Sequence, residues 1–206
     1  MPHGTFDIRT MLSLPFVYDL FQDMVGAGRW RRDFSNNFIR PKAADKILDI
    51  GCGTARILDY LPESINYCGF DASATYIDTA AQRYGKRGEF ICVDVDQAGL
   101  DNLGTFDIVL ASGVLHHLDD EQANGLMELA RRRMRTGGRL LTIEPCLAAD
   151  QSPIARYLIT HDRGRFVRDS NGYASIAHQV FQEVHGTLRH RRWMPYTHWI
   201  MECSTC

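Results

Sequence analysis

Short apolar segments alternate with amphipathic helical patterns through the middle of this 206-residue chain. Strands that alternate with helices join by right-handed crossovers and form parallel sheets. The pattern therefore predicts a doubly wound α/β fold. Five segments have the length and composition of buried strands, namely Lys46–Ile50, Tyr67–Phe70, Phe90–Val93, Phe106–Ala111 and Arg139–Ile143. Helical patterns are expected at Thr54–Leu61, after a capping Ser73, and at Glu121–Arg135, where Gly137 and Gly138 end the helix.

The end of the chain predicts a reversed strand. Thr187–Met194 and Thr197–Cys203 both have strand patterns, and only Pro195 and Tyr196 lie between them. So short a link joins antiparallel strands. We therefore expect a mostly parallel, seven-stranded sheet with one antiparallel strand in a C-terminal hairpin.

Charge and hydropathy exclude several classes of protein. The net charge of −2 argues against broad, charge-driven binding to nucleic acid. No apolar run approaches the length that crosses a bilayer, and the first ten residues lack the pattern of a secretory signal. The six cysteines are scattered through the chain, as is typical of a reducing compartment. We expect a cytoplasmic protein without nucleic-acid or membrane partners.

The ends of the first two expected strands carry residues suited to a nucleoside ligand. Gly51 and Gly53 follow the first strand, and glycines let the backbone turn sharply and approach a ligand closely. Asp71 ends the second strand, where an acid can bind ribose hydroxyls. Ligands bind at the carboxyl ends of such strands, so these residues are expected to share one site.

Two residues separate the candidate ligands. A dinucleotide-binding loop has a third glycine near position 56, where this chain has Arg56. The carboxylate of Asp49 disfavours a pyrophosphate and favours a ligand that carries an ammonium or a sulfonium. The chain also lacks the phosphate-binding lysine motif of nucleotide triphosphatases. An NAD-linked oxidoreductase is kept as an alternative.

Five stretches in the same order resemble the motifs of class I S-adenosylmethionine-dependent methyltransferases of the small-molecule type. They are Leu48–Gly53, Gly69–Ser73, Asp94–Val95, Ala111–Leu118 and Gly137–Leu140. The resemblance covers Lys46 to Glu144 and extends to the terminal hairpin. It implies a Rossmann-like fold and methyl transfer from S-adenosylmethionine to a small molecule, at O, N, C or S. A non-catalytic S-adenosylmethionine-binding module is a further alternative.

The resemblance also implies an organisation and a cofactor site. We expect one domain with a helical lid at 1–40, a cofactor-binding core at 46–144, a substrate-side insertion at 151–186 and the hairpin at 187–205. Asp49 would orient the methionine ammonium, Asp71 would bind the ribose, and the carbonyl of Ala111 would meet the ammonium. The cofactor-binding residues that the resemblance implies are Asp49, Gly51, Cys52, Gly53, Asp71, Ala72, Asp94, Val95, Ala111, Tyr18 and Gln22.

Catalytic and substrate-binding residues are expected near the fourth and fifth strands. A hydroxyl or amine acceptor needs a base, for which His117 or His116 is the candidate, with Tyr18 or Glu144 behind it. The alternative is that one histidine packs inward and makes only a local hydrogen bond. The candidate substrate-binding residues are Glu144, Arg163, Arg165, Arg168 and Tyr196, and the three arginines suit an anionic substrate. No metal site is expected, because no cluster has metal-ligand spacing.

Overall fold

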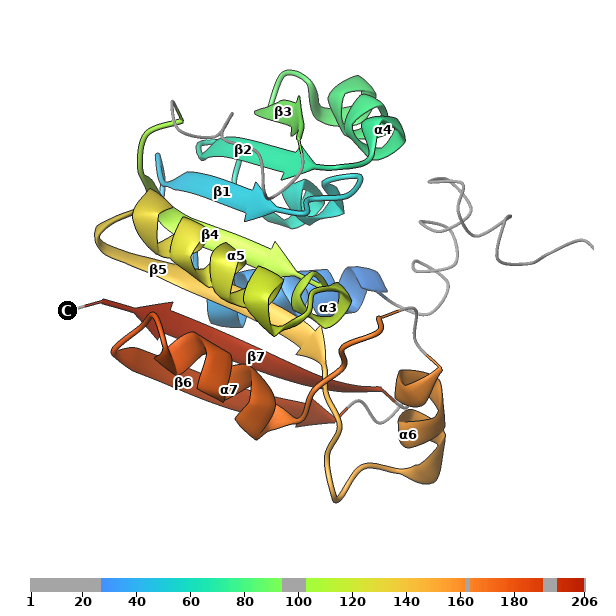
Figure 1. Cartoon of the computed structure of the whole chain (residues 1–206). Coiled ribbons are helices and arrows are strands. Elements are labelled where there is room, and N and C mark those ends of the chain that lie inside the picture. Colours follow the sequence, from blue (N-terminus) through green and yellow to red (C-terminus); the bar gives the residue numbers. More distant parts are fainter. Residues whose placement is uncertain (1–26, 94–102, 162–163, 191–195, 206) are drawn as a thin grey trace, which may run out of the picture.

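The computed structural model describes residues 27–93, 103–161, 164–190 and 196–205. Seven strands form one sheet in the order β3-β2-β1-β4-β5-β7-β6 (Figure 1). The first five strands run parallel, and β7 pairs antiparallel with both β5 and β6. The expected doubly wound, mostly parallel sheet is therefore confirmed. The strands are β1 (Lys46–Ile50), β2 (Asn66–Asp71), β3 (Gly88–Cys92), β4 (Phe106–Ser112), β5 (Met134–Pro145), β6 (Glu183–His190) and β7 (Thr197–Ser204).

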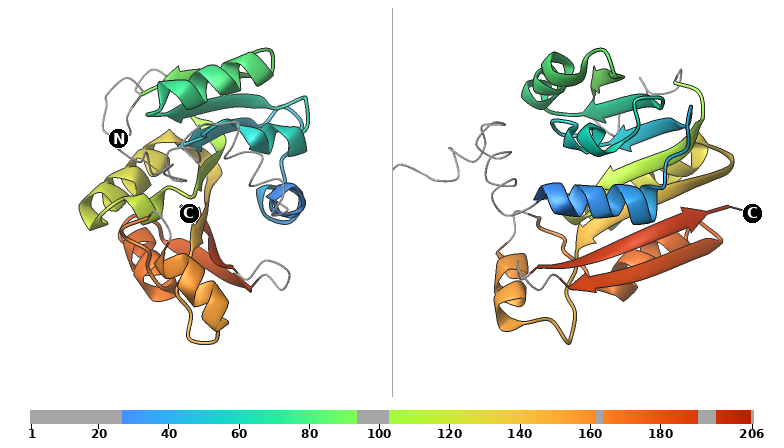
Figure 2. Two further views of the ribbon diagram at one scale, coloured as in Figure 1. Left: turned by 90° about the vertical axis from the view of Figure 1, so that its right-hand side faces the viewer. Right: turned by 180° about the vertical axis from the view of Figure 1, so that it is seen from behind.

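Helices cover both faces of this sheet (Figure 2). The α-helices are α3 (Ala27–Phe34), α4 (Ala74–Tyr84), α5 (Asp120–Arg133), α6 (Pro153–Thr160) and α7 (Ser170–His178). The described residues also form three short helical turns, namely the π-helix η1 (Ser35–Ile39) and the 3-10 helices η2 (Arg56–Tyr60) and η4 (Leu115–His117). Local signals set the helix starts, since Ser73 caps α4 and Asp119 forms a capping box with Gln122 at α5. Within the described residues, no helix is long and apolar enough to cross a membrane.

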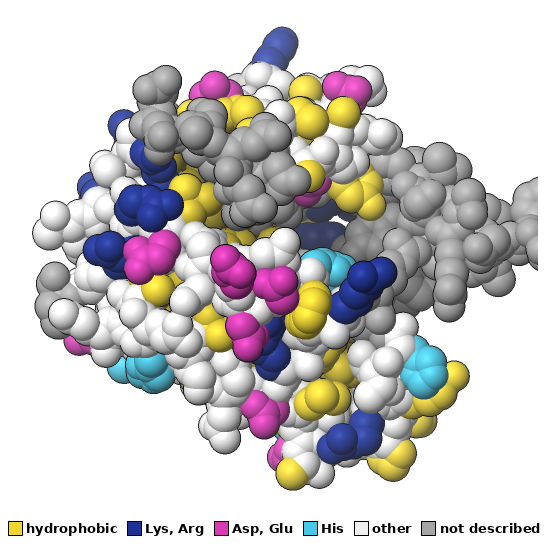
Figure 3. Space-filling model, viewed as in Figure 1, with side chains coloured by type: hydrophobic (Ala, Val, Ile, Leu, Met, Phe, Trp, Pro, Cys, Tyr) yellow, Lys and Arg dark blue, Asp and Glu magenta, His cyan; other side chains and the backbone are white. Residues whose placement is uncertain are grey.

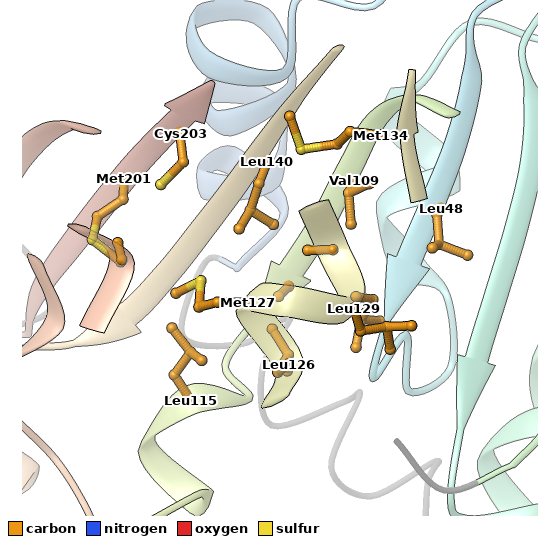
Figure 4. Close-up of a cluster of buried hydrophobic side chains, with 14 of the residues drawn as sticks. Leu48, Val109, Leu115, Leu126, Met127, Leu129, Met134, Leu140, Met201 and Cys203 are labelled. Carbon is orange, nitrogen blue, oxygen red and sulfur yellow. The ribbon is translucent and has the colours of Figure 1, made fainter. Parts of the chain in front are cut away.

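Two apolar clusters hold the helices on the sheet. One lies between the sheet and α5 and α7, where Leu126 and Met127 meet strand residues such as Val109 and Leu140 (Figure 4). The other lies on the opposite face, where Phe34 and the apolar side of α4 pack against strand residues. Alternate residues of each central strand enter opposite clusters, which is why these strands read as continuous apolar runs. The carboxyl ends of the central strands are therefore held in place by packing on both faces of the sheet.

The surface of α5 follows the helix dipole. Its first turn carries Asp120 and Glu121, and its last turn carries three arginines, 131 to 133. Figure 3 shows this face of the molecule, with acidic side chains in the middle of the view and basic ones toward its left side. Acids at the start and bases at the end of a helix stabilise it.

The expected end of α5 was wrong. The helix stops at Arg133, and Gly137 and Gly138 lie inside β5 rather than after the helix. The β4–β5 pairing shifts register between Phe106 and Ile108, so residues 135–138 form a bulge. Gly137 has a φ of 73°, which glycine adopts without strain. The two glycines therefore shape a bulge.

The terminal hairpin also differs from expectation. β6 starts at Glu183 rather than Thr187, and His190 pairs with Thr197, so the link is longer than Pro195 and Tyr196. This register places Val184 opposite Cys203, and burial of such apolar pairs fixes a strand's register. α3 covers the polar stretch around Trp30, inside the helical lid expected at 1–40, and tertiary packing of buried Phe34 stabilises it. The rest of that lid before residue 27 lies outside the described residues.

Candidate cofactor and catalytic site

The loop after β1 depends on glycine. Gly51 and Gly53 have φ angles of 68° and 54°, which residues with a Cβ rarely adopt. A Cβ on Gly51 would lie 2.6 Å from Val114 Cγ2, whereas one on Gly53 would meet no described atom within 4 Å. Gly51 thus packs against the turn after β4, and Gly53 faces open space. The backbone at Gly53 is therefore accessible to a ligand.

Asp71 ties this loop to the end of β2. Its Oδ2 accepts a hydrogen bond from the Gly53 N–H at 3.0 Å, and its Oδ1 accepts one from the Ser73 N–H at 2.8 Å. Each carboxylate oxygen has two lone pairs, so both oxygens keep acceptor capacity for ligand hydroxyls. Ala72 follows as an exposed residue. The structure thus brings Gly53, Asp71 and Ala72 together, as expected from the sequence.

Asp49 lies behind the glycine loop. Its side chain is buried, and its Oδ2 accepts a hydrogen bond from the Tyr67 hydroxyl at 2.6 Å. The pKa of Asp49 is raised to about 7, chiefly by burial; the Tyr67 hydrogen bond lowers it, and the charge of Asp71 raises it. Burial also raises the pKa of the neighbouring Cys52 thiol, which therefore stays neutral. Ala111, fully buried, pairs with Ile50 beside this group.

A buried histidine–glutamate pair lies at the ends of β4 and β5. Glu144 is fully buried, and its Oε2 lies 2.6 Å from Nδ1 of His116. Its Oε1 accepts the N–H groups of Val114 and Leu115, both at 3.0 Å. A carboxylate at Nδ1 holds the proton there and leaves Nε2 as the basic nitrogen. His117 is exposed, and its ring centre lies 4.0 Å from that of His116.

The segment between α6 and α7 covers His116. A Cβ on Gly164 would lie 2.1 Å from His116 Cδ2, so only glycine fits there. The Phe166 N–H donates to the His116 carbonyl at 3.0 Å. Arg168 donates to the carbonyls of Leu115 and Leu118 and to Asp120 Oδ1, the last at 2.6 Å. The donors of Arg168 therefore hold the η4 turn and the start of α5.

The structure separates the expected substrate-binding residues. Glu144 was expected to lie behind a histidine or to contact substrate; its side chain is fully enclosed and lies against His116. Arg165 is exposed on the covering segment. Five expected site residues lie outside the described part of the chain, namely Tyr18, Gln22, Asp94, Val95 and Arg163.

Three aromatic residues at the sheet edge form a stack. The Tyr196 ring lies 4.9 Å from that of His198, which stacks on Trp30 at 5.5 Å. Sequence reasoning selected Tyr196 but missed its two partners. Trp30 lies in a polar stretch and His198 in a strand, so no local signal joins them. Among the described residues, no group of three or more His, Cys, Asp or Glu side chains could hold a metal ion.

Comparisons with known proteins agree with this geometry. A family profile described as "Methyltransferase domain" matches residues 48–140. An uncharacterized Synechococcus protein is 32% identical over 140 residues, which are 61% of this chain and 33% of that protein. The chain thus spans about a third of the length of this curated relative.

Solved structures share the fold at low identity. The S-adenosylmethionine-dependent methyltransferase SibL is similar with a TM-score of 0.70 and 18% identity, over 90% of this chain and 57% of that one. The mitomycin 7-O-methyltransferase MmcR is similar with a TM-score of 0.68 and 16% identity, over 95% of this chain and 60% of that one. The profile match to a methyltransferase domain over residues 48–140 and the shared fold agree with the resemblance to class I S-adenosylmethionine-dependent methyltransferases.

Proposed function

We propose that the protein transfers a methyl group from S-adenosylmethionine to a hydroxyl group of a small molecule. The observation that carries this proposal is the His116–Glu144 pair, at the same sheet edge as the glycine loop and Asp71. A sulfonium methyl is already activated, whereas a hydroxyl is a weak nucleophile and benefits from a base. The O-methyltransferase activity named for the similar mitomycin enzyme supports a hydroxyl acceptor.

The residues at the edge fit such a cofactor. Gly53 leaves room for a ligand at its backbone, and Asp71 keeps acceptor capacity for two ribose hydroxyls. Asp49 supplies a carboxylate for the methionine ammonium, in keeping with the charge argument above. Val95, Asp94, Tyr18 and Gln22 complete the proposed cofactor site. When bound, the cofactor supplies the electrophilic methyl group and leaves as S-adenosylhomocysteine.

His116 acts as the base in this proposal. Glu144 holds the proton on Nδ1, so Nε2 takes the proton of the acceptor hydroxyl as the oxygen–methyl bond forms and the sulfur–methyl bond breaks. The enclosed carboxylate also stabilises the imidazolium that results. The proposal puts the segment 151–186 on the acceptor side, and the contacts of Gly164 and Phe166 with His116 support this. Exposed Arg165 would face an anionic acceptor group there.

The experiment is calorimetric titration of the purified protein with S-adenosylmethionine and S-adenosylhomocysteine. Asp71→Ala should weaken binding at least about tenfold, because hydrogen bonds to a charged acceptor contribute roughly 1.5–3 kcal/mol each. Asp78→Ala, which removes an exposed acid from α4, is the matched control and should bind as wild type does. Folded wild-type protein that binds neither ligand would overturn the proposal.

The same preparation tests the alternatives. Binding of NAD in place of both sulfur ligands would favour the oxidoreductase. A metabolite-extract screen with cofactor labelled in the methyl group tests turnover, and His116→Gln should slow it about 100-fold or more if His116 is the base. Binding without any labelled product across such screens would favour the non-catalytic module.

A further inference from the structure

Tyr67 reaches Asp49 along a path that two glycines leave open. In the sheet, Tyr67 is opposite Gly88 on β3, and Asp49 is opposite Gly69 on β2. A Cβ on Gly69 would lie 2.9 Å from Tyr67 Cε1, and one on Gly88 would lie 2.8 Å from Tyr67 Cδ1. The phenol ring therefore lies across both glycine positions. A larger residue at either position would displace it from Asp49.

The contact at the end of this path is short and enclosed. The Tyr67 hydroxyl donates to Asp49 Oδ2 at 2.6 Å, and both residues are only 4% exposed. Hydrogen bonds from a hydroxyl to a carboxylate are short and strong because the acceptor is charged. Among the described residues, no other side chain donates to this carboxylate. Tyr67 is thus the group that holds one oxygen of Asp49 in place.

The other titratable groups around Asp49 do not help it to ionise. Asp71 is a like charge and raises the pKa of Asp49. Burial raises the pKa of the Cys52 thiol and of the Tyr67 phenol, and Cys68 raises both further, so both groups stay neutral. Burial and the charge of Asp71 raise the pKa of Asp49, the Tyr67 hydrogen bond is the one interaction that lowers it, and the net pKa is about 7. The charge of Asp49 near neutral pH therefore depends on Tyr67.

We propose that Tyr67 is a positioning residue for the cofactor: its hydroxyl keeps the Asp49 carboxylate charged and correctly oriented for the ligand's ammonium group. This role rests on the proposed function, because the ligand is S-adenosylmethionine or S-adenosylhomocysteine. Gly69 and Gly88 contribute to this positioning, because their lack of a side chain makes room for the Tyr67 ring.

The test is the pH dependence of S-adenosylhomocysteine affinity in Tyr67→Phe, measured by calorimetry from about pH 6 to about pH 9. Loss of the hydrogen bond raises the pKa of Asp49, so less of the variant carries the charge at neutral pH. We expect binding at least about threefold weaker than wild type at pH 7, with the deficit narrowing as the pH rises and both proteins ionise. A deficit that is absent, or that stays constant with pH, would overturn the proposal.

Two control variants make this result specific. Tyr84→Phe removes an equivalent hydrogen bond, 2.7 Å long, from a tyrosine to Asp59 Oδ1, and it should bind as wild type at every pH. In an Asp49→Asn background, adding Tyr67→Phe should change the affinity for S-adenosylhomocysteine less than about twofold, because position 49 no longer carries a charge for Tyr67 to stabilise. A full Tyr67→Phe effect in that background would show a merely structural role and contradict the proposal.

A ligand-free measurement separates this inference from the proposed function. The carboxyl carbon resonance of Asp49, followed by NMR against pH, should titrate at a higher pH in Tyr67→Phe than in wild type. If wild type binds no S-adenosylhomocysteine, the proposed function fails while the shift in titration still shows the Tyr67–Asp49 coupling. If wild type binds and the titration does not move, the role of Tyr67 is overturned.

Discussion

Two buried carboxylates at one sheet edge have different surroundings. Glu144 accepts the N–H groups of the η4 turn and lies against the His116 ring, so its charge has several partners. Asp49 has only the Tyr67 hydroxyl among the described residues. A buried charge with few hydrogen bonds is held at a cost in free energy. The charge of Asp49 therefore makes the ligand-free protein less stable than a neutral side chain at this position would.

This difference predicts how stability depends on pH. The folded-state pKa of Asp49 is raised from an ordinary value of 3.8 to about 7, so the folded protein binds this proton more tightly than the unfolded chain. Stability due to this group is present at low pH and is lost as the pH rises from about 4 to about 7. Asp49→Asn should therefore be the more stable protein at pH 8, by up to about 4 kcal/mol, and nearly equal to wild type at pH 4. Urea unfolding of ligand-free protein at both pH values measures this, and an equal difference at the two would contradict it.

Residue-level prediction from the sequence succeeded where the signal was local. Gly51, Gly53 and Asp71 follow apolar strands directly, and the structure brings them together. The role proposed for Tyr67 could not be predicted from the sequence, because it depends on which residues lie opposite Tyr67 in the neighbouring strands. Strand pairing is a tertiary property that a single strand's sequence does not specify.

At the scale of elements, Arg168 organises the region around the η4 turn. It joins the segment before α7 to the carbonyls at both ends of η4 and to Asp120 at the start of α5. Its guanidinium carbon lies 5.8 Å from the ring centre of Tyr173, and this cation–π contact adds a link to α7. Sequence reasoning grouped Arg168 with Arg165 as a substrate-facing cation, since composition alone cannot distinguish a buried arginine from an exposed one.

Substitution should separate these two arginines. Arg168→Ala leaves three carbonyls and Asp120 without their donor, which should destabilise the protein by about 2–4 kcal/mol. Arg165→Ala, the matched control on the exposed side of the same segment, should change stability by less than about 0.5 kcal/mol. Thermal or urea unfolding of the two variants makes the comparison. Equal stabilities would show that the Arg168 contacts contribute little.

The elements themselves were predictable to different degrees. The five parallel strands were expected because buried strands are continuous apolar runs, and β1 has the expected bounds. The β5 bulge was missed because two glycines after a helix usually mark its end. The longer hairpin link was missed because the pairing of β6 with β7 is set by burial across the sheet.

At the scale of the whole molecule, one charged cluster joins the start of the described chain to its last strand. Glu202 on β7 accepts from Arg40, which ends the π-helix, with contacts of 2.6 and 2.7 Å. It also accepts from Arg139 on β5 at 3.1 Å. Arg139 in turn donates to the carbonyls of Phe38 and Ile39 in the π-helix. The cluster therefore holds η1 against the face that β5 and β7 share.

Removing the charge at its centre should loosen this connection. Glu202→Gln keeps the shape of the side chain but leaves Arg139, 19% exposed, without its ionic partner. We expect a loss of about 1–2 kcal/mol in the free energy of unfolding, discounted because Arg40 and Glu202 are partly exposed to solvent. The loss should be smaller in about 1 M salt. Salt screens the attraction between Glu202 and the two arginines, and this attraction is what the variant lacks.

Glu183→Gln is the matched control for this prediction. Glu183 lies on the neighbouring strand β6, at the exposed edge of the sheet. Among the described residues, its carboxylate accepts a side-chain hydrogen bond only from the Ser204 hydroxyl, at 2.7 Å. Its substitution should change stability by less than about 0.5 kcal/mol at either salt concentration, since an exposed side chain exchanges its partner for water. Urea unfolding of the three proteins at low and high salt gives the comparison. If both variants lose the same stability, or if the Glu202→Gln loss does not respond to salt, the Arg40–Glu202–Arg139 cluster does not act as an ionic link between the two parts of the molecule.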